Sequence, residues 1–265
     1  MIPCSGVHED PDITPILNKS IWKQHPSVLL VRYTTDFDLS HETNWWYVIK
    51  DTPFDLSELK AKRRYEINKG NKYFDVREIV PSDYKEEIWE VLTESLKAYP
   101  DKYRAHFEHD SYMETIQGWN CYKAYGAFCK ESGRLCGYSV LERNGRYISF
   151  ALQKTIPQYE HLAINAALVY KIVVDHNSFF ESGGYICDGS RSINHETAFQ
   201  DYLEKYFEFR KAYCRLHVVY KPIIGVIVKL IYPFRKLFTL FDNIKSVHLV
   251  NGIMTMEEIV RDQNK

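Results

Sequence analysis

The sequence predicts an α/β fold of the α+β kind, in which helices flank a mixed and mostly antiparallel central sheet. Strand-like segments separated by short turns follow one another closely in residues 122–152. Helical and strand-like segments then alternate as far as residue 220. Because 45% of the 265 residues are hydrophobic, the chain can form the core of one large domain or of two smaller ones around a shared sheet.

The antiparallel part is predicted from residues 122–129 (YKAYGAFC), 134–143 (RLCGYSVLER) and 146–152 (RYISFAL). Each segment is rich in β-branched and aromatic residues. Asn144-Gly145 separates the last two, and Asn-Gly is the strongest short signal for a β-hairpin. We therefore expect a three-stranded meander here.

Similar composition predicts further strands at 27–33, 45–50, 73–79, 185–188 and 215–220. Apolar residues at helical spacing predict helices over about 55–68, 82–99, 112–119, 157–183 and 197–207. Gly70 is expected to end the first helix as a C-cap, and Pro157 to begin the long one that stops at Gly183-Gly184. In sequence order, we expect N-terminal strands and a basic helix in 1–80, the core in 81–220 and a C-terminal helical extension in 221–265.

Charge and cysteine content limit the class of protein. The 34 basic residues nearly balance the 35 acidic ones, which argues against a dedicated nucleic-acid coat. The six cysteines form no C-x-x-C pair, and His106 and His109 lack further ligands, so no metal is expected. Reduced cysteines and a start without the regions of a secretory signal (MIPCSGVHEDPDITP) predict a cytoplasmic protein.

The order meander, helix, strand, helix, strand in 122–220 resembles the core of the GNAT acyltransferases. Two stretches are similar to the Fem-like (FemAB-type) branch, whose best-known members add amino acids to cell-wall precursors. The first is a basic helix at 60–72 (KAKRRYEINKGNK) that leads into a strand. The second runs from Asp188-Gly189-Ser190 through Phe199 to Phe207-Glu208-Phe209.

This resemblance implies an acyltransferase that moves an acetyl or aminoacyl group onto an amine or hydroxyl, with an amino sugar or a cell-envelope precursor as acceptor. It implies acyl-coenzyme A (acetyl-coenzyme A) as co-substrate and no metal. It also implies that the strand with Ser149 and Ala151 lends backbone groups to the donor, and that Tyr213 reprotonates the leaving thiolate.

The chain departs from the pattern in two places. Residues 153–161 (QKTIPQYEH) lack the spaced glycines that bring backbone amides close to a diphosphate. The coiled-coil arm of the tRNA-dependent Fem enzymes is also absent. The donor therefore stays open between acyl-coenzyme A and aminoacyl-tRNA, and the latter predicts salt-sensitive RNA binding.

The basic helix carries Arg63, Arg64 and Lys69 among its cations, with only Glu66 opposing them. An arginine fork matches phosphate or carboxylate, so we expect these residues to bind the donor or the substrate. The alternative is a solvated charged face.

The segment 188–195 (DGSRSINH) joins a strand to a helix and concentrates polar groups. His195 is the expected base and Asp188 orients it, while Arg191 binds an acidic group. Ser190, Arg191 and His195 are expected to border a cleft opposite Ser149 and Ala151. The alternative is that Asp188 ends the strand, a nearby residue caps the helix and His195 is exposed.

Residues 221–241 (KPIIGVIVKLIYPFRKLFTLF) are apolar with interspersed basic residues. They form either a helical cap on the sheet or, through 222–241, a peripheral membrane contact. The expected acceptor is a small molecule or a lipid-linked precursor. The alternative function is a membrane-peripheral binding module that keeps the fold without donor binding.

Overall fold

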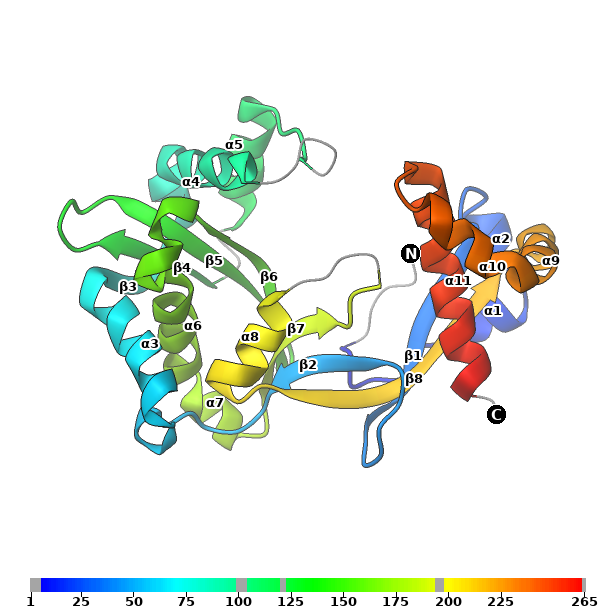
Figure 1. Cartoon of the computed structure of the whole chain (residues 1–265), viewed down its shortest axis with the longest axis horizontal. Coiled ribbons are helices and arrows are strands. Elements are labelled where there is room, and N and C mark those ends of the chain that lie inside the picture. The colour runs from blue at the N-terminus through cyan, green and yellow to red at the C-terminus, as the bar shows by residue number, and fades with distance from the viewer. Residues whose placement is uncertain (1–5, 99–103, 120–122, 194–197, 264–265) are drawn as a thin grey trace. The chain divides into compact units, whose positions relative to one another are not determined.

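The computed structural model describes residues 6–98, 104–119, 123–193 and 198–263 (Figure 1). Its strands form an eight-stranded, mostly antiparallel sheet in the order β1-β8-β2-β7-β6-β5-β4-β3. The strands are β1 Leu30–Leu39, β2 Trp46–Lys50, β3 Phe74–Ile79, β4 Lys123–Cys129, β5 Leu135–Asn144, β6 Tyr147–Thr155, β7 Tyr185–Ser190 and β8 Arg210–Tyr220. The mixed, mostly antiparallel sheet flanked by helices is thereby confirmed.

The α-helices among the described residues are α1 Thr14–Leu17, α2 Ile21–Gln24, α3 Ala61–Tyr73, α4 Lys85–Lys97, α5 His109–Gly118, α6 Ile164–Asp175, α7 Asn177–Glu181, α8 Ala198–Phe207, α9 Pro222–Ile231, α10 Arg235–Phe238 and α11 Lys245–Gln263.

The predicted hairpin joins β5 to β6, with Asn144 opposite Tyr147. Gly145 has φ 58° there, the left-handed conformation that glycine adopts without a side-chain clash.

The chain forms two compact units. The first comprises Met1–Val48, Gly189–Asp201 and Arg210–Lys265, and the second comprises Ile49–Asp188 and Tyr202–Phe209. In the first unit, β1 pairs antiparallel with β8, and α9 and α11 contact β8. The sequence segments 1–80, 81–220 and 221–265 remain a prediction about domains.

In the second unit, helices cover both faces of the strands β3–β6. Helix α6 contacts β3, β4 and β5 on one face, and α3 packs on α6. Helix α4 contacts β5 and β6, and its residues Ile88, Val91 and Leu92 share a buried core with Val140 of β5. A side chain at Gly137 would instead meet Ile164 of α6. Since residues an odd number apart on a strand point to opposite faces, α4 and α6 cover opposite faces.

Gly70 does not end the basic helix, as the sequence had predicted, because α3 continues to Tyr73. Gly70 is buried where α3 meets the first turn of α6. A Cβ at this position would lie 2.5 Å from the backbone oxygen of Ala163 and 2.9 Å from the amide nitrogen of Ala167. The glycine is therefore needed for close helix packing rather than for a left-handed cap.

The single long helix predicted from Pro157 to Gly183 is wrong. Residues Pro157–Leu162 form a 3₁₀ helix, and α6 begins only after Ala163, which has φ 61°. The helix is interrupted again at His176, which lies between the end of α6 at Asp175 and the start of α7 at Asn177. Apolar spacing continues through both breaks, so the pattern alone does not reveal them.

Candidate functional site

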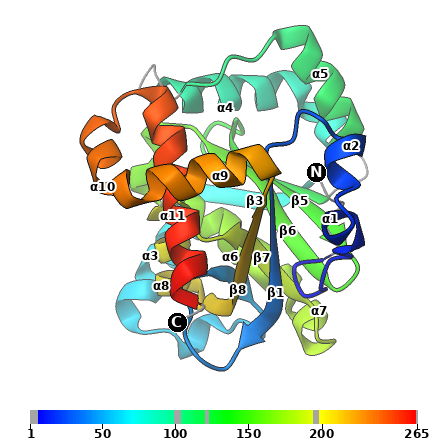
Figure 2. The ribbon, with the colours of Figure 1, turned by 90° about the vertical axis from the view of Figure 1, so that its right-hand side faces the viewer.

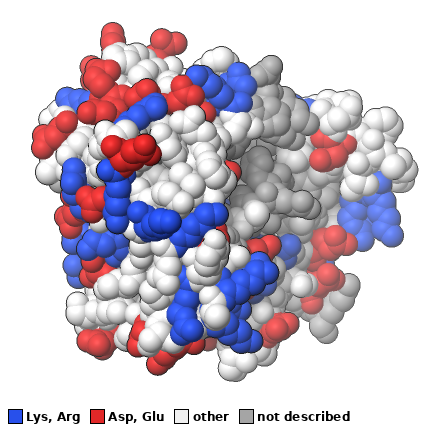
Figure 3. Space-filling view, turned by 60° about the vertical axis from the view of Figure 1, so that its left-hand side comes forward, with Lys and Arg blue, Asp and Glu red and all other residues white. Residues whose placement is uncertain are grey.

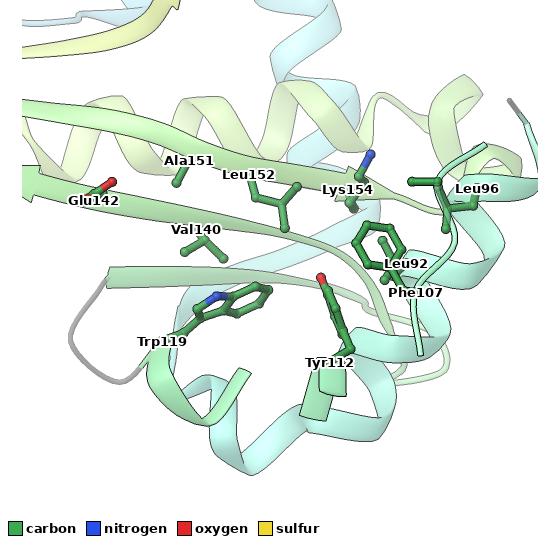
Figure 4. A pocket seen from close by; sticks show the side chains of 11 residues that line it. Leu92, Leu96, Phe107, Tyr112, Trp119, Val140, Glu142, Ala151, Leu152 and Lys154 are labelled. Carbon is green, nitrogen blue, oxygen red and sulfur yellow. The ribbon is translucent and has the colours of Figure 1, made fainter. Parts of the chain in front are cut away.

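A pocket of about 430 Å³ opens in the second unit between β5, β6 and the helices α4 and α5 (Figure 4). Most of its surface is apolar. The lining residues are Leu92, Leu96, Ala105, Phe107, Tyr112, Trp119, Val140, Glu142, Ala151, Leu152 and Lys154. A concave, mainly apolar pocket with a few polar groups is the usual form of a small-molecule site.

Its sheet wall is shaped by a β-bulge at Ala151. Val140 stands opposite Leu152, but the next residue, Leu141, stands opposite Phe150, so the pairing skips Ala151. In a regular strand Ala151 and Leu152 would point to opposite faces. Both line the pocket, because the extra residue resets the alternation. The bulge also leaves Ala151 outside the ladder with β5.

Beside the bulge, the pairing of β6 with β7 is short. The two strands run parallel, and the matched positions are Tyr147 with Tyr185, Ile148 with Ile186 and Ser149 with Cys187. Strand β6 continues to Thr155 beyond the last of these pairs. The predicted site residues Ser149 and Ala151 therefore lie where β6 leaves this pairing.

The two charged side chains of the pocket are separated along it. Figure 4 shows Glu142 at one end, the rings of Trp119 and Tyr112 between Glu142 and Lys154, and Leu96 beyond Lys154. Glu142 stands directly opposite Ser149 on the paired strand. A ligand with an apolar body and opposite charges at its ends would match this arrangement.

Tyr112 forms the deep polar contact of the pocket. Its hydroxyl lies 3.1 Å from the hydroxyl of the buried Tyr138. Burial raises the pKa of both phenols, so each keeps its proton near neutral pH. The pair can donate or accept a hydrogen bond but does not supply a base.

Three of the predicted site residues on the segment 188–195, namely Asp188, Ser190 and Arg191, are described. Asp188 and Ser190 lie on β7, and the carbonyl oxygen of Ser190 accepts a hydrogen bond from Nε2 of Gln200 at 3.2 Å. Arg191 donates from Nη1 to the carbonyl oxygen of Asn44 at 2.7 Å. His195, the predicted base, lies outside the described residues.

Arg191 and Tyr213 come together around Trp46 in the first unit. The Arg191 guanidinium lies 4.6 Å from the indole centroid, and the ammonium of Lys211 lies 4.7 Å from it. The Tyr213 ring meets the same indole edge-on at 6.2 Å. Burial lowers the pKa of Arg191, which still leaves the guanidinium charged. Two cations on one indole form a surface suited to an anion.

The basic helix lies away from the pocket. Arg63, Arg64 and Lys69 are on α3, which packs on α6, whereas α4 and α5 cover the pocket face. Arg64 donates from Nη1 to the carbonyl oxygen of Ser57 at 2.9 Å. Figure 3 turns towards the viewer the side of the molecule on which Figure 1 labels α3. Lys and Arg side chains form clusters on this side.

The first turn of α6 is poorly suited to a diphosphate. Gly70 of α3 packs directly on Ala163 and Ala167, so another chain segment already occupies the approach to these backbone groups. Glu160 adds a carboxylate just before the helix. The residues here thus do not form the cradle that coenzyme A would need.

Among residues 6–98, 104–119, 123–193 and 198–263, no group of three or more His, Cys, Asp and Glu side chains is placed to bind a metal.

Sequence reasoning missed Glu142, Lys154, Trp46 and Lys211. Glu142 is the first of three exposed residues that follow seven buried ones on β5, so its sequence position indicates only an exposed strand end. The exposure of Trp46 was easier to predict from the sequence. Adjacent residues of a strand point to opposite faces, so Trp45 and Trp46 cannot both face the same side of the sheet. Trp45 is 1% exposed, and Trp46 takes the outward position.

The meander, crossover helix α6, parallel strand β7, helix α8 and strand β8 define a GNAT-like fold. The solved structure of FemX has this fold, with a TM-score of 0.50 and 11% identity over 84% of this chain and 73% of FemX. L-PGS from Bacillus licheniformis is 14% identical over 81% of this chain and 70% of its own, with a TM-score of 0.46. A GCN5-related N-acetyltransferase-like protein from Streptococcus suis is 12% identical over 77% and 67%, with a TM-score of 0.39.

No protein-family model and no curated protein matches the sequence. The likeness to FemX confirms, at the level of the fold, the resemblance to the Fem-like branch of the GNAT acyltransferases.

Proposed function

We propose that the protein transfers an acyl group onto an amine or hydroxyl of an acceptor bound in the pocket. The observation that carries this proposal is the bulge at Ala151. It lies on the pocket wall, on the strand that in GNAT acyltransferases lends backbone groups to the donor. Bulges are frequent next to active sites because they free backbone groups and redirect side chains.

In the proposed reaction, the acceptor nitrogen or oxygen attacks the acyl carbonyl carbon. The new N–C or O–C bond forms, the C–S or C–O bond to the donor breaks, and a backbone amide near Ala151 stabilises the oxyanion. The acceptor proton goes to a base, and the leaving thiolate or alkoxide takes a proton. Tyr213 is the proposed acid for that last step.

Two groups are proposed as the base. His195, oriented by Asp188, is the choice favoured by the sequence. Glu142 is the choice favoured by the pocket, because its carboxylate lies at one end of it. A base must come within about 3 Å, or one water, of the acceptor atom.

The proposed acceptor is a small molecule or the head of a lipid-linked precursor, such as an amino sugar. Trp119, Tyr112 and Phe107 offer aromatic faces for a sugar, and Lys154 offers a charge for an acidic group. The proposed donor is an acyl ester or thioester, and Arg191 is its proposed anion-binding group, because α3 with Arg63 and Lys69 lies away from the pocket. The free thiols of Cys129, Cys136, Cys187 and Cys214 support a cytoplasmic location.

The test is an acyl-transfer assay with labelled acetyl-coenzyme A or aminoacyl-tRNA against a panel of amino sugars and amines, read by mass spectrometry. Wild-type protein should form a product, and Ala151→Trp, which fills the pocket, should abolish it. Ala61→Trp adds the same volume at another exposed alanine and should retain activity. Glu142→Gln and His195→Ala identify the base, since loss of the true base lowers turnover by roughly 10²–10⁴-fold.

Absence of product with both donors, or full activity in Ala151→Trp, would contradict the proposal. The first turn of α6 favours a second candidate, a binding module without donor chemistry, because Gly70 of α3 packs directly on it. Calorimetry with coenzyme A separates the candidates further. An acceptor that binds in the pocket without any donor binding would support the module.

A further inference from the structure

The C-terminal segment exposes many apolar side chains. Ile223, Val226, Ile227 and Leu230 follow the i, i+3, i+4, i+7 spacing of one helix face on α9. Their exposed fractions are 72%, 59%, 46% and 66%. The residues that follow along the chain also expose apolar side chains, and we call the whole set the apolar stripe: the four residues on α9 together with Phe234, Leu237, Leu240, Phe241 and Ile244.

The same segment is well anchored on its other side. Val228 is 3% exposed, and α9 contacts β8. Arg235 is hydrogen-bonded to Glu258 on α11 and lies over the ring of Tyr232 at 4.4 Å. Figure 2 looks onto α9 and α10 within the first unit, with α11 running down behind them. The stripe is therefore the outer face of a packed element and not an unfolded tail.

Packing in the first unit explains only the inner face of α9. A helix cap needs one apolar face, yet α9 carries a second one on its exposed side. Single exposed apolar residues are ordinary, but a contiguous stripe of this kind marks an interaction site. None of the helices within the described residues is long and apolar enough to cross a bilayer.

Charge identifies the partner. Residues 221–241 contain Lys221, Lys229, Arg235 and Lys236 and no acidic residue. Arg235 is paired with Glu258 of α11, and Asp242, which follows within the stripe, contacts His248, so Lys229 and Lys236 are the exposed cations beside the stripe. Two copies of this surface would repel each other, whereas a surface of anionic lipid would attract it. Apolar side chains bordered by lysines and arginines, with Phe234 and Phe241 among them, are typical of a helix lying in a membrane interface.

We infer that the apolar stripe of α9 and α10 docks this protein onto a bilayer surface that contains anionic lipid. The stripe enters the boundary between headgroups and acyl chains, and Lys229 and Lys236 lie against the lipid phosphates. This inference does not depend on the proposed acyl transfer, since α9 and α10 belong to the first unit and the pocket belongs to the second.

Vesicle co-flotation tests the inference with the full-length protein. Wild type should bind vesicles of phosphatidylcholine with phosphatidylglycerol and bind phosphatidylcholine alone much more weakly. Ile223→Glu with Leu230→Glu should weaken binding at least about tenfold, because two buried apolar side chains are lost. The matched control, Leu17→Glu with Leu29→Glu, changes two exposed leucines of the same unit and should bind like wild type.

A second pair of variants tests the charge. Lys229→Ala should weaken binding to anionic vesicles about fivefold, while Lys23→Ala, an exposed lysine on α2, should not. A higher salt concentration should also weaken the binding of wild type to anionic vesicles, because salt screens the attraction between charges. Sedimentation velocity of each variant confirms the folded state and reports self-association. Failure of wild type to float, or an apolar-stripe variant that loses a dimer and keeps its vesicle binding, overturns the inference.

Discussion

At the residue scale, Lys50 is the least expected feature of the molecule. Its side chain is fully buried at the end of β2, 3.6 Å from the carboxylate of Glu208, and Nζ donates to Oγ1 of Thr52 at 2.8 Å. Burial lowers the pKa of Lys50, and the nearby Glu208 partly opposes that shift. A buried ammonium is tolerated only when it is paired and hydrogen-bonded.

We expect Glu208→Gln to destabilise the protein, because it leaves the Lys50 charge without its carboxylate. Fully buried pairs lose about 3–5 kcal/mol when one partner is removed. Glu208 is 41% exposed, so solvent screening should reduce the loss in the free energy of unfolding to about 1–2 kcal/mol. Urea unfolding provides the measurement.

The double-mutant cycle with Lys50→Met provides the control. Methionine keeps much of the volume and removes the buried charge, so Glu208→Gln should cost little in that background. An equal cost of Glu208→Gln in both backgrounds would show that the two residues are not coupled.

At the element scale, the contact of α3 with α6 depends on the absence of a side chain at Gly70. Gly70→Ala should lower the free energy of unfolding by about 1–3 kcal/mol, the usual cost of overpacking a core. The new methyl group would press on backbone atoms of Ala163 and Ala167, which cannot rotate away as a side chain can. Thermal or urea unfolding measures the loss.

Gly118→Ala is the matched helical control, since a Cβ there has no neighbour within 4 Å. Alanine favours helix over glycine, so this variant should be neutral or slightly more stable. If Gly70→Ala were as stable as Gly118→Ala, the close approach of the two helices would be wrong.

At the scale of the whole molecule, histidines make stability depend on pH in opposite directions. Burial lowers the pKa of His176, which is 5% exposed and donates from Nδ1 to the carbonyl oxygen of Ile172. Hydrogen bonds to Asp110 and Glu86 raise the pKa of His109. Between the lowered pKa of His176 and the unfolded value of about 6.5, the unfolded chain binds the extra proton, so acid destabilises the fold.

We therefore expect the stability advantage of wild type over His176→Gln to shrink when the pH falls from 7.5 to 5.5. For His109 the sign reverses, because its contribution is present below pH 6.5 and is lost as the pH rises through the raised pKa. The advantage of wild type over His109→Gln should thus grow at pH 5.5. Urea unfolding at both pH values checks the two signs, and changes of the same sign would refute the assignment.

Local patterns predicted most of the secondary structure. The meander and its Asn144-Gly145 turn are encoded within a few residues, since strand composition and turn chemistry act over that distance. The ends of strands that depend on pairing with a segment far away in the sequence were harder to predict. Strand β8 begins at Arg210, well before the predicted 215, and its residue Tyr213 pairs with Leu39 at the far end of β1.

The sequence alone predicted a mixed, mostly antiparallel sheet with flanking helices and the likeness to the Fem-like GNAT fold. The tertiary structure decided that Ala151 forms a bulge, because pairing register depends on the opposite strand. It also decided that Glu142 and Lys154 share a pocket and that Gly70 is a packing residue. Each of these depends on contacts between segments far apart in the chain, which local periodicity and spacing do not encode.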